Sequence, residues 1–370
     1  MRGERALRLF MTTDAVGGVW TYSLDLAGAL ARSGVRTTLA VLGPAAKSDQ
    51  VEAARRIRGL ELIQTELPLD WTAQNSAELK QAAKAVAALA RRSDADIVHL
   101  NSPTLAGYAD FHAPVVGACH SCVGTWWRAV RGGRLPRDFR WREDALGRGY
   151  GVCEALVAPT YAFAEDTMAA HGVAAPLVVH NGRRPVATPA RKADVIFTAG
   201  RLWDAGKNLA LIDAAAAQLP VPVYAAGPMQ SPTGERVELK HVHPLGRLGE
   251  REVADWMGRA SIFVSTPLYE PFGLSILEAA QAGCALVLSD IPSLRELWDE
   301  AAVFVPTDQP DVLAHALQSL LDNPRRAEEL GRAARKQAGA YTAEAMGKGM
   351  LSLYRSLALA RTAALAEAAA

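Results

Sequence analysis

Residues 262–283 read IFVSTPLYEPFGLSILEAAQAG, and this stretch contains one complete unit of the predicted fold. It opens on the apolar run Ile262-Phe263-Val264, which is typical of a strand buried on both faces. A loop follows, and from Leu274 the apolar residues recur at helical spacing until a glycine ends the pattern. Strand, loop and helix in this order are the repeating unit of a parallel α/β sheet.

The same unit recurs along the chain. The expected strands are short apolar runs at residues 6–11, 36–42, 97–100, 115–118, 156–158, 195–198, 221–226, 285–288 and 303–305. The rhythm lapses at 181–192, which is rich in Gly, Pro and Arg and is therefore the expected linker. The sequence predicts an α/β protein with two Rossmann-like, doubly wound domains, and ligands bind to such sheets at the carboxyl ends of the strands.

Composition limits the class of protein. The 370 residues exceed what one ordinary core accommodates, which agrees with two domains. Forty basic and 39 acidic residues nearly cancel, whereas a general nucleic-acid binder needs a basic surface. Four cysteines are too few for a disulfide framework, no apolar run is long enough to span a membrane, and the amino terminus lacks a signal-peptide pattern. We therefore expect a cytoplasmic protein.

Two of the cysteines form a C-x-x-C pattern, Cys119-His120-Ser121-Cys122. This pattern allows a redox or zinc-binding role, or two small buried residues on either side of a functional histidine. Because no second pair of ligands stands at metal-binding spacing, the second interpretation is favoured and no metal site is predicted.

Two glutamates in the opening stretch carry the strongest chemical signal. Glu270 follows the strand, and Glu278 lies eight positions later in the helix. Between them, Gly273 permits a close approach of the backbone to a ligand. The start of the helix near Leu274 offers unpaired N–H groups that suit a phosphate. An alternative interpretation of Glu278 is purely local, because Ser275 and Glu278 also form the S-x-x-E pattern of a capping box.

The complete pattern resembles that of the retaining glycosyltransferases of family 4, which include glycogen synthases and mannosyltransferases and have the GT-B fold. Their E-x7-E signature is matched by Glu270 and Glu278, with the remaining matches at Phe272, Gly273 and Leu274. The resemblance implies that Glu278 holds the ribose of a nucleotide-sugar donor. It also implies that Glu270 contacts the donor sugar, and that the backbone of the three intervening residues lines the sugar and the diphosphate.

A second element, Gly200-Arg201-Leu-Trp-Asp-Ala-Gly-Lys207-Asn208, resembles the G-R-x-x-x-x-K-G/N element of the same family. There the arginine and the lysine clamp the donor diphosphate. Negative charge grows on the β-phosphate as the sugar leaves, and two fixed cations stabilise it without an obligatory metal or cofactor. Taken singly, Arg201 and Lys207 could also be members of surface ion pairs.

Other glycines and a histidine also match the family. Gly17 and Gly18 resemble its glycine loop after the first strand, where the backbone approaches the donor phosphate and the acceptor. Gly227 matches a loop that lacks one of its usual glycines, and Leu245 belongs to the element beside the nucleotide base. His120 stands where the family commonly has a histidine near the reacting sugar. Together with the E-x7-E and clamp elements, these glycines, Leu245 and His120 are the residues expected to contact the donor.

The resemblance also implies the domain plan. Residues 1–184 form the expected acceptor-side domain and residues 185–345 the expected nucleotide-sugar-binding domain, which face each other across a cleft. Residues 346–370 form a helix that packs back on the first domain, with Tyr354 and Leu357 as its expected anchors. The family's interdomain N-G-x-D pattern is matched only in its first half, because Arg184 replaces the acid.

Residues 126–142 combine six arginines with three tryptophans and a phenylalanine. Trp126, Trp127, Arg128 and Arg131 are therefore candidate acceptor-side residues. Basic and aromatic side chains together suit a phosphate-bearing acceptor, a stacked sugar or an anionic membrane surface, which would place the protein peripherally on the inner face of the membrane. The alternative is a solvated arginine-rich loop over a few packed aromatics.

The predicted reaction is the transfer of a sugar from a nucleotide-diphosphate sugar to a hydroxyl acceptor, with retention at the anomeric carbon. The acceptor class stays open among glycans, lipid-linked molecules and small molecules. Two alternatives belong to other functional classes. A sugar-nucleotide epimerase of the same fold would convert the donor without an acceptor, and a non-catalytic nucleotide-sugar-binding subunit would bind the donor without turnover.

Overall fold

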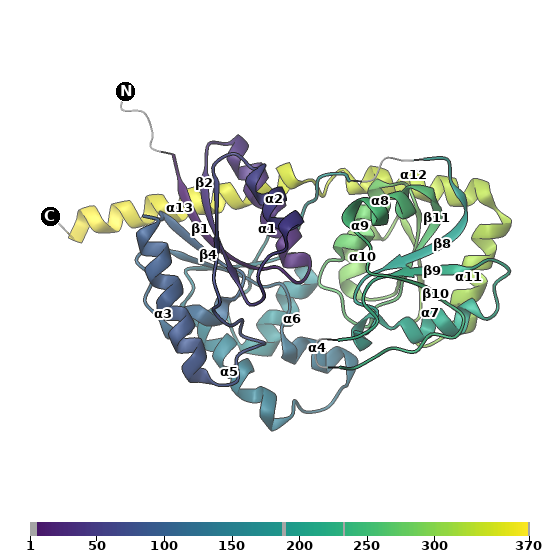
Figure 1. Cartoon of the computed structure of the whole chain (residues 1–370), viewed down its shortest axis with the longest axis horizontal. Coiled ribbons are helices and arrows are strands. Elements are labelled where there is room, and N and C mark those ends of the chain that lie inside the picture. Colours follow the sequence, from purple (N-terminus) through teal and green to yellow (C-terminus); the bar gives the residue numbers. More distant parts are fainter. Residues whose placement is uncertain (1–5, 187–189, 232–233, 369–370) are drawn as a thin grey trace. The chain divides into compact units, whose positions relative to one another are not determined.

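The computed structural model describes residues 6–186, 190–231 and 234–368. The chain forms two compact units (Figure 1). The first comprises residues 1–125, 133–182 and 343–370, and the second comprises residues 126–132 and 183–342. Each unit contains one parallel sheet, so the prediction of two Rossmann-like α/β domains is confirmed.

The first unit is built on a seven-stranded sheet with the order β3-β2-β1-β4-β5-β6-β7. Its chain runs outward in one direction from β1 and then in the other from β4, so β1 and β4 flank the switch point where such sheets bind ligands. The strands are β1 (Arg8–Asp14), β2 (Arg36–Leu42), β3 (Leu60–Gln64), β4 (Ile97–Leu100), β5 (Val115–Ala118), β6 (Ala155–Ala158) and β7 (Leu177–Val178). The helices are α1 (Gly18–Arg32), α2 (Ser48–Arg55), α3 (Ser76–Arg92), η1 (Pro103–Tyr108), α4 (Val123–Val130, which continues into the residues assigned to the second unit), α5 (Arg137–Val152), α6 (Tyr161–His171) and α13 (Ala343–Ala368).

The second unit is built on a six-stranded sheet with the order β10-β9-β8-β11-β12-β13, and β8 and β11 flank its switch point. The strands are β8 (Ala193–Ala199), β9 (Val223–Ala226), β10 (His243–Gly246), β11 (Ala260–Ser265), β12 (Ala285–Ser289) and β13 (Ala302–Val305). The helices are η2 (Ala205–Lys207), α7 (Leu209–Ala216), α8 (Glu250–Arg259), α9 (Leu274–Gln281), α10 (Pro292–Trp298), α11 (Pro310–Asp322) and α12 (Pro324–Ala338).

Strand β11 shows why the second sheet must be covered on both faces. Successive side chains of a strand point to opposite faces. Ile262 and Val264 pack in one apolar cluster with α7 and α11, whereas Phe263 packs in another with α8 and α9. All three side chains are fully buried. The continuous apolar run in the sequence is therefore explained by a central strand between two helical layers.

Helix α13 packs along α1 within the first unit. The two helices approach closely at Gly347, because a Cβ atom at that position would lie 2.6 Å from the Cβ of Ala29. The fully buried Tyr354 bonds through its hydroxyl to Nδ1 of His99, at 2.7 Å. Tyr354 belongs to an apolar cluster with residues of β1 and α1, and the partly buried Leu357 packs against the same cluster.

Three strands escaped the sequence prediction. β3 is a half-exposed edge strand, β7 has two residues, and β10 begins His243-Pro244, so none of them forms a continuous apolar run. Residues 187–189 of the predicted linker and residues 369–370 of the predicted C-terminal helix lie outside the described residues.

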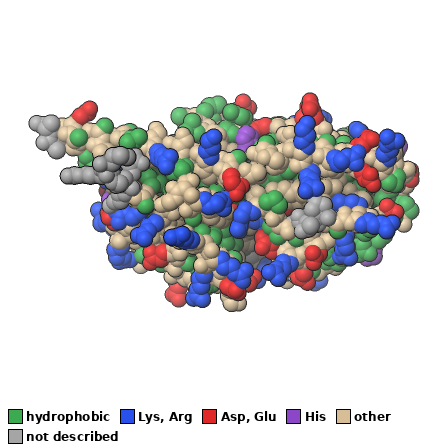
Figure 2. All heavy atoms as spheres, turned by 90° about the horizontal axis from the view of Figure 1, so that it is seen from above, with side chains coloured by type: hydrophobic (Ala, Val, Ile, Leu, Met, Phe, Trp, Pro, Cys, Tyr) green, Lys and Arg blue, Asp and Glu red, His purple; other side chains and the backbone are tan. Residues whose placement is uncertain are grey.

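The surface agrees with the near-zero net charge. Acidic and basic side chains are interspersed over the face seen in Figure 2. None of the described helices combines the length and the apolar character that a membrane span requires.

Candidate active site

The loops that follow β8 and β11 meet at the switch point of the second sheet. The backbone N–H of Leu268, in the loop after β11, donates a hydrogen bond of 2.9 Å to the carbonyl of Gly206 in the loop after β8. Ser293 and Ser289 hold the β11 loop from its other side, because their hydroxyls donate to the carbonyls of Glu270 and Pro267, both at 2.6 Å. Side chains on both loops are thereby fixed relative to each other.

The predicted clamp residues are both paired with acids in this arrangement. Lys207 forms an ion pair with Glu270, whose side chain is 13% exposed. Arg201, which is 53% exposed, bonds through Nη2 to Oδ2 of Asp204, at 2.9 Å. Burial alone would raise the pKa of Asp204, but the Arg201 guanidinium and the N–H of Gly206 outweigh it and hold that pKa below its usual value. Asp204 lies inside the G-R-x-x-x-x-K element, yet the sequence analysis assigned it no role.

Gly200, Gly227 and Leu245 lie at the carboxyl ends of neighbouring strands. The N–H of Gly200 donates to the carbonyl of Ala226, at 3.0 Å. Gly227 has φ +145°, and a Cβ atom there would lie 1.7 Å from the carbonyl oxygen of Gly200, so only glycine fits. The half-buried Leu245 lies on β10. Beside these strand ends is a cavity of about 360 Å³ lined by Gly227, Pro228, Met229, Gln230, Arg236, Gly246 and Arg247.

The turn between the two glutamates is shaped by the core beneath it. Phe272 is buried and packs edge-on against Tyr341, with ring centroids 5.8 Å apart. Only its backbone can therefore face a ligand. Gly273 has φ +86° and is the N-cap of α9, which begins at Leu274 without a side-chain cap. The first N–H groups of this helix are free of any capping side chain, which suits an anion.

The helix boundary decides between the two interpretations of Glu278. Because α9 begins at Leu274, Ser275 is its second residue and cannot be its N-cap. The capping-box interpretation is therefore wrong. Glu278 instead forms an ion pair with Nε of Arg183, and its side chain remains 20% exposed.

Arg183 is a residue that the sequence analysis missed. Its side chain is 7% exposed and also bonds through Nη2 to Oε1 of Glu250, at 2.6 Å. Its N–H donates to the carbonyl of Tyr341 at 3.2 Å, and its own carbonyl accepts from the amide of Gln281 at 3.1 Å. The neighbouring Arg184, which the sequence comparison singled out, is exposed. The signal that could have identified Arg183 is the pair Arg183-Arg184, which ends the N-G-x-D pattern where the family has an acid.

In the first unit the predicted glycine loop follows β1. Asp14 shapes it, because Oδ1 accepts from the N–H groups of Val16, at 2.8 Å, and Gly17, at 3.3 Å. Gly17 is the N-cap of α1 and has no side-chain cap, and Gly18 is the first residue of that helix. Both glycines are exposed. The loop thus presents an uncapped helix start at the switch point of the sheet.

His120 joins a buried polar network at the same edge of the sheet. Its Nε2 lies 2.6 Å from Oδ1 of Asn101, and Nε2 of His99 lies 3.2 Å from the same oxygen. The amide nitrogen of Asn101 donates to the carbonyl of Thr12 at 2.6 Å, so Oδ1 is an acceptor and both Nε2 atoms carry hydrogen. Nδ1 of His99 accepts a hydrogen bond from the hydroxyl of Tyr354. In the His120 ring, Nδ1 carries no hydrogen and is therefore the acceptor.

Burial determines the charge of both histidines. It lowers the pKa of His120 to about 3, with a smaller contribution from His99, and it lowers the pKa of His99 to about 4. The ring of Tyr22 packs edge-on against His120, with centroids 4.7 Å apart. His120 is therefore neutral at physiological pH and held in one orientation. His99 lies on β4.

The basic aromatic stretch spans the end of α4 and the beginning of α5. Trp126 donates through Nε1 to Oδ1 of Asp204, at 3.2 Å, and both residues belong to the second unit. The guanidinium of Arg131 lies 6.0 Å from the Trp126 ring centroid. Arg128 and Arg131 are exposed, and Trp127 is half-buried. The acceptor-side role of these four residues stays a prediction.

Comparisons with known proteins cover nearly the whole chain. Residues 16–185 match the model of Glycosyltransferase Family 4, and residues 184–337 match the model of Glycosyl transferases group 1. A D-rhamnosyltransferase of Pseudomonas aeruginosa is 33% identical over 121 residues, which are 30% of this chain and 32% of that protein. A GDP-mannose-dependent alpha-(1-6)-phosphatidylinositol dimannoside mannosyltransferase of Mycobacterium tuberculosis is 25% identical over 184 residues, which are 50% of this chain and 45% of that protein. The matches span less than half the length of these curated relatives.

Two solved structures share the fold over almost the entire chain. Sucrose-phosphate synthase from Thermosynechococcus elongatus has a TM-score of 0.77 at 19% identity and covers 96% of this chain and 100% of its own. The Anabaena protein HepE, solved in complex with UDP-glucose, has a TM-score of 0.75 at 16% identity and covers 95% of this chain and 100% of its own.

Proposed function

Since the chain belongs to the GT-B glycosyltransferases, with a family 4 domain followed by a group 1 domain, we propose that it transfers a sugar from a nucleotide-diphosphate donor to a hydroxyl acceptor with retention. One observation carries this proposal. Lys207 and Glu270 come from different loops and meet in an ion pair at the switch point of the second sheet, where α/β sheets bind nucleotides. The UDP-glucose complex of the structurally similar Anabaena protein supports a nucleotide sugar as donor.

The proposed mechanism uses the two cations as electrophilic catalysts. The bond between the anomeric carbon and the β-phosphate oxygen breaks while the acceptor hydroxyl attacks from the same face. The acceptor proton passes to an oxygen of the departing phosphate, so charge and atoms balance. Arg201 and Lys207 stabilise the negative charge that develops on the diphosphate. Before the donor binds, their partners Asp204 and Glu270 neutralise the two cations, and the diphosphate takes over this role.

The remaining residues position the donor. Glu278 accepts hydrogen bonds from the ribose hydroxyls, with Arg183 fixing the carboxylate. The cavity beside Gly227 and Leu245 receives the base, and His120 contacts the reacting sugar. No metal or cofactor is required for this chemistry, because the cations are supplied by the chain.

A thermal-shift panel of nucleoside diphosphates and nucleotide sugars tests the donor assignment. One nucleotide is expected to raise the melting temperature by several degrees at about 100 times its Kd, because binding to the folded state adds about 2.7 kcal/mol. The shift should persist in EDTA. If none of the nucleotides stabilises the protein, the donor assignment is refuted.

A membrane surface is the acceptor environment that we propose. Arg131, Arg134 and Arg137 are exposed, and Phe139 beside them is 36% exposed. One relative acts, by its name, on a phosphatidylinositol dimannoside. Each basic residue near an anionic surface contributes about 1 kcal/mol of binding, so replacing all three arginines by alanine should weaken sedimentation with phosphatidylserine vesicles by at least about tenfold.

The control removes the same charge elsewhere. Arg325, Arg332 and Arg335 are exposed on α12, and their replacement by alanine should leave vesicle binding unchanged. Equal losses in both triple variants would reflect net charge alone, and unchanged binding in the first variant would exclude the membrane proposal.

A further inference from the structure

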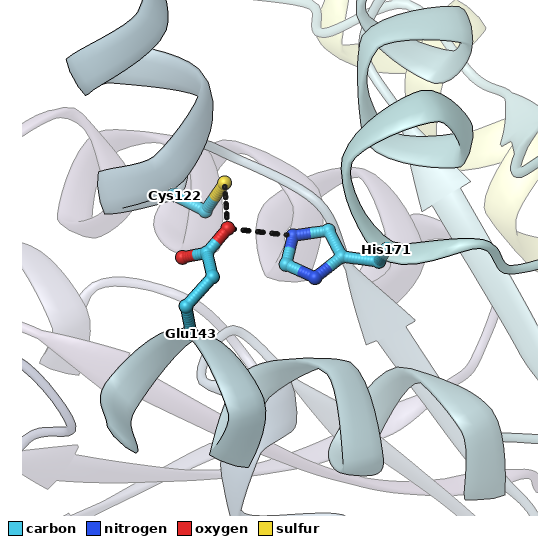
Figure 3. A group of neighbouring side chains, drawn as sticks. All are labelled: Cys122, Glu143 and His171. Atoms are coloured by element: carbon cyan, nitrogen blue, oxygen red, sulfur yellow. Dashed lines mark hydrogen bonds and ion pairs between the residues drawn. The ribbon is translucent and has the colours of Figure 1, made fainter. Parts of the chain in front are cut away.

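Three side chains with metal-binding atoms converge in the first unit. Cys122 directly precedes α4, Glu143 lies on α5, and His171 is the last residue of α6. In Figure 3 all three side chains point toward one another from these separate elements. Their ligand atoms lie within 4.8 Å of one another.

Two of the separations match those around a tetrahedral metal ion. Sγ of Cys122 lies 3.6 Å from Oε1 of Glu143, and that oxygen lies 3.3 Å from Nε2 of His171. Around Zn²⁺, bond lengths of about 2.3 Å to sulfur and about 2.0 Å to nitrogen and oxygen place S and O about 3.6 Å apart, and N and O about 3.3 Å apart. Two of the three separations are thus compatible with one central ion, and the third, between Sγ of Cys122 and the His171 ring, is within 4.8 Å.

The side chains of the cluster are largely buried and are held by neighbouring groups. Cys122 is 8% exposed, and the side chains of His171 and Glu143 are 3% and 16% exposed. The second oxygen of Glu143 accepts from the N–H of Gly124, at 3.1 Å. A Cβ atom at position 124 would lie 2.0 Å from Oε1 of Glu143, so the glycine makes room for the carboxylate. The ring of Tyr150 packs edge-on against His171, with centroids 5.0 Å apart.

We propose that Cys122, Glu143 and His171 bind one Zn²⁺ ion, with water as the fourth ligand. The thiolate and imidazole favour Zn²⁺ over the hard cations Mg²⁺ and Ca²⁺. Binding displaces the thiol proton and involves no redox step. The ion ties the start of α4 and the end of α6 to the middle of α5, and it uses none of the donor-site residues. The C-x-x-C pattern is not the ligand set, because the cluster contains only one of its two cysteines.

Cobalt substitution provides the test, with the full chain freed of any affinity tag and of metal by chelator treatment. Co²⁺ should bind with a stoichiometry of one, with intense tetrahedral bands in the visible range and a thiolate-to-cobalt charge-transfer band in the near ultraviolet. Zn²⁺ should displace it and raise the melting temperature. Cys122→Ser should abolish the charge-transfer band.

Cys119→Ser is the matched control, because Cys119 is also buried and lies three positions away. It should retain the band and the stoichiometry. Glu143→Gln and His171→Gln should weaken zinc binding by at least about tenfold in competition with a chromogenic chelator. The proposal is overturned if the wild-type protein shows no charge-transfer band, if the band survives in Cys122→Ser, or if both Gln variants bind zinc as tightly as the wild type. The cluster is then a contact between Glu143 and His171 beside a thiol.

Discussion

Replacing Lys207 by methionine is expected to lower kcat by about 10²- to 10³-fold, equivalent to about 2.7–4 kcal/mol of transition-state stabilisation. Methionine keeps most of the apolar stem and removes the charge that faces Glu270. The charge on the diphosphate grows only as the sugar leaves, so kcat should fall more than donor affinity. Single-turnover release of nucleoside diphosphate measures the chemical step, and calorimetric titration measures the donor Kd.

Lys240→Met is the matched control. Lys240 is exposed in the same unit and lies outside the switch point, so its removal should change neither kcat nor Kd. A folded Lys207→Met protein whose kcat is within about threefold of the wild type would contradict the electrophilic role, because one preorganised cation is worth far more than this.

Replacing Glu278 by glutamine is expected to raise the donor Kd by about 10- to 100-fold, because hydrogen bonds from ribose hydroxyls to a charged acceptor are worth about 1.5–3 kcal/mol. The substitution also removes the ion-pair partner of Arg183, whose side chain is 7% exposed, so the melting temperature should fall as well. Calorimetric titration and thermal unfolding of the same preparation separate the two effects.

Two further variants separate the effects of the two Arg183 ion pairs on donor affinity and on stability. Glu250→Gln breaks the other ion pair of Arg183 but leaves Glu278 in place, so donor affinity should stay within about twofold of the wild type. Arg183→Met removes the group that fixes the carboxylate, so both stability and donor affinity should fall. A stability loss with unchanged donor affinity in Glu278→Gln would mean that Glu278 is structural only.

The helical and strand periodicities predicted the two doubly wound sheets correctly, because a strand that is buried on both faces of a parallel sheet is a continuous apolar run in the sequence. Ile262, Phe263 and Val264 are apolar in succession because the sheet has a helical layer on each side. The short edge strands β3, β7 and β10 are not continuous apolar runs and were therefore not predicted. The two glutamates and the clamp residues were identifiable because each set lies within one short motif.

The sequence by itself thus determined the fold class and the location of the switch-point loops, and it supplied the candidate donor-binding residues. The tertiary structure decided which side chains pair with one another. Glu278 meets Arg183 across 95 positions, and Tyr354 meets His99 across 255. Cys122 meets Glu143 and His171 rather than the second cysteine of its own motif. Such pairs depend on the order of strands in the sheet, which brings distant loops to one edge, and no local periodicity encodes that order.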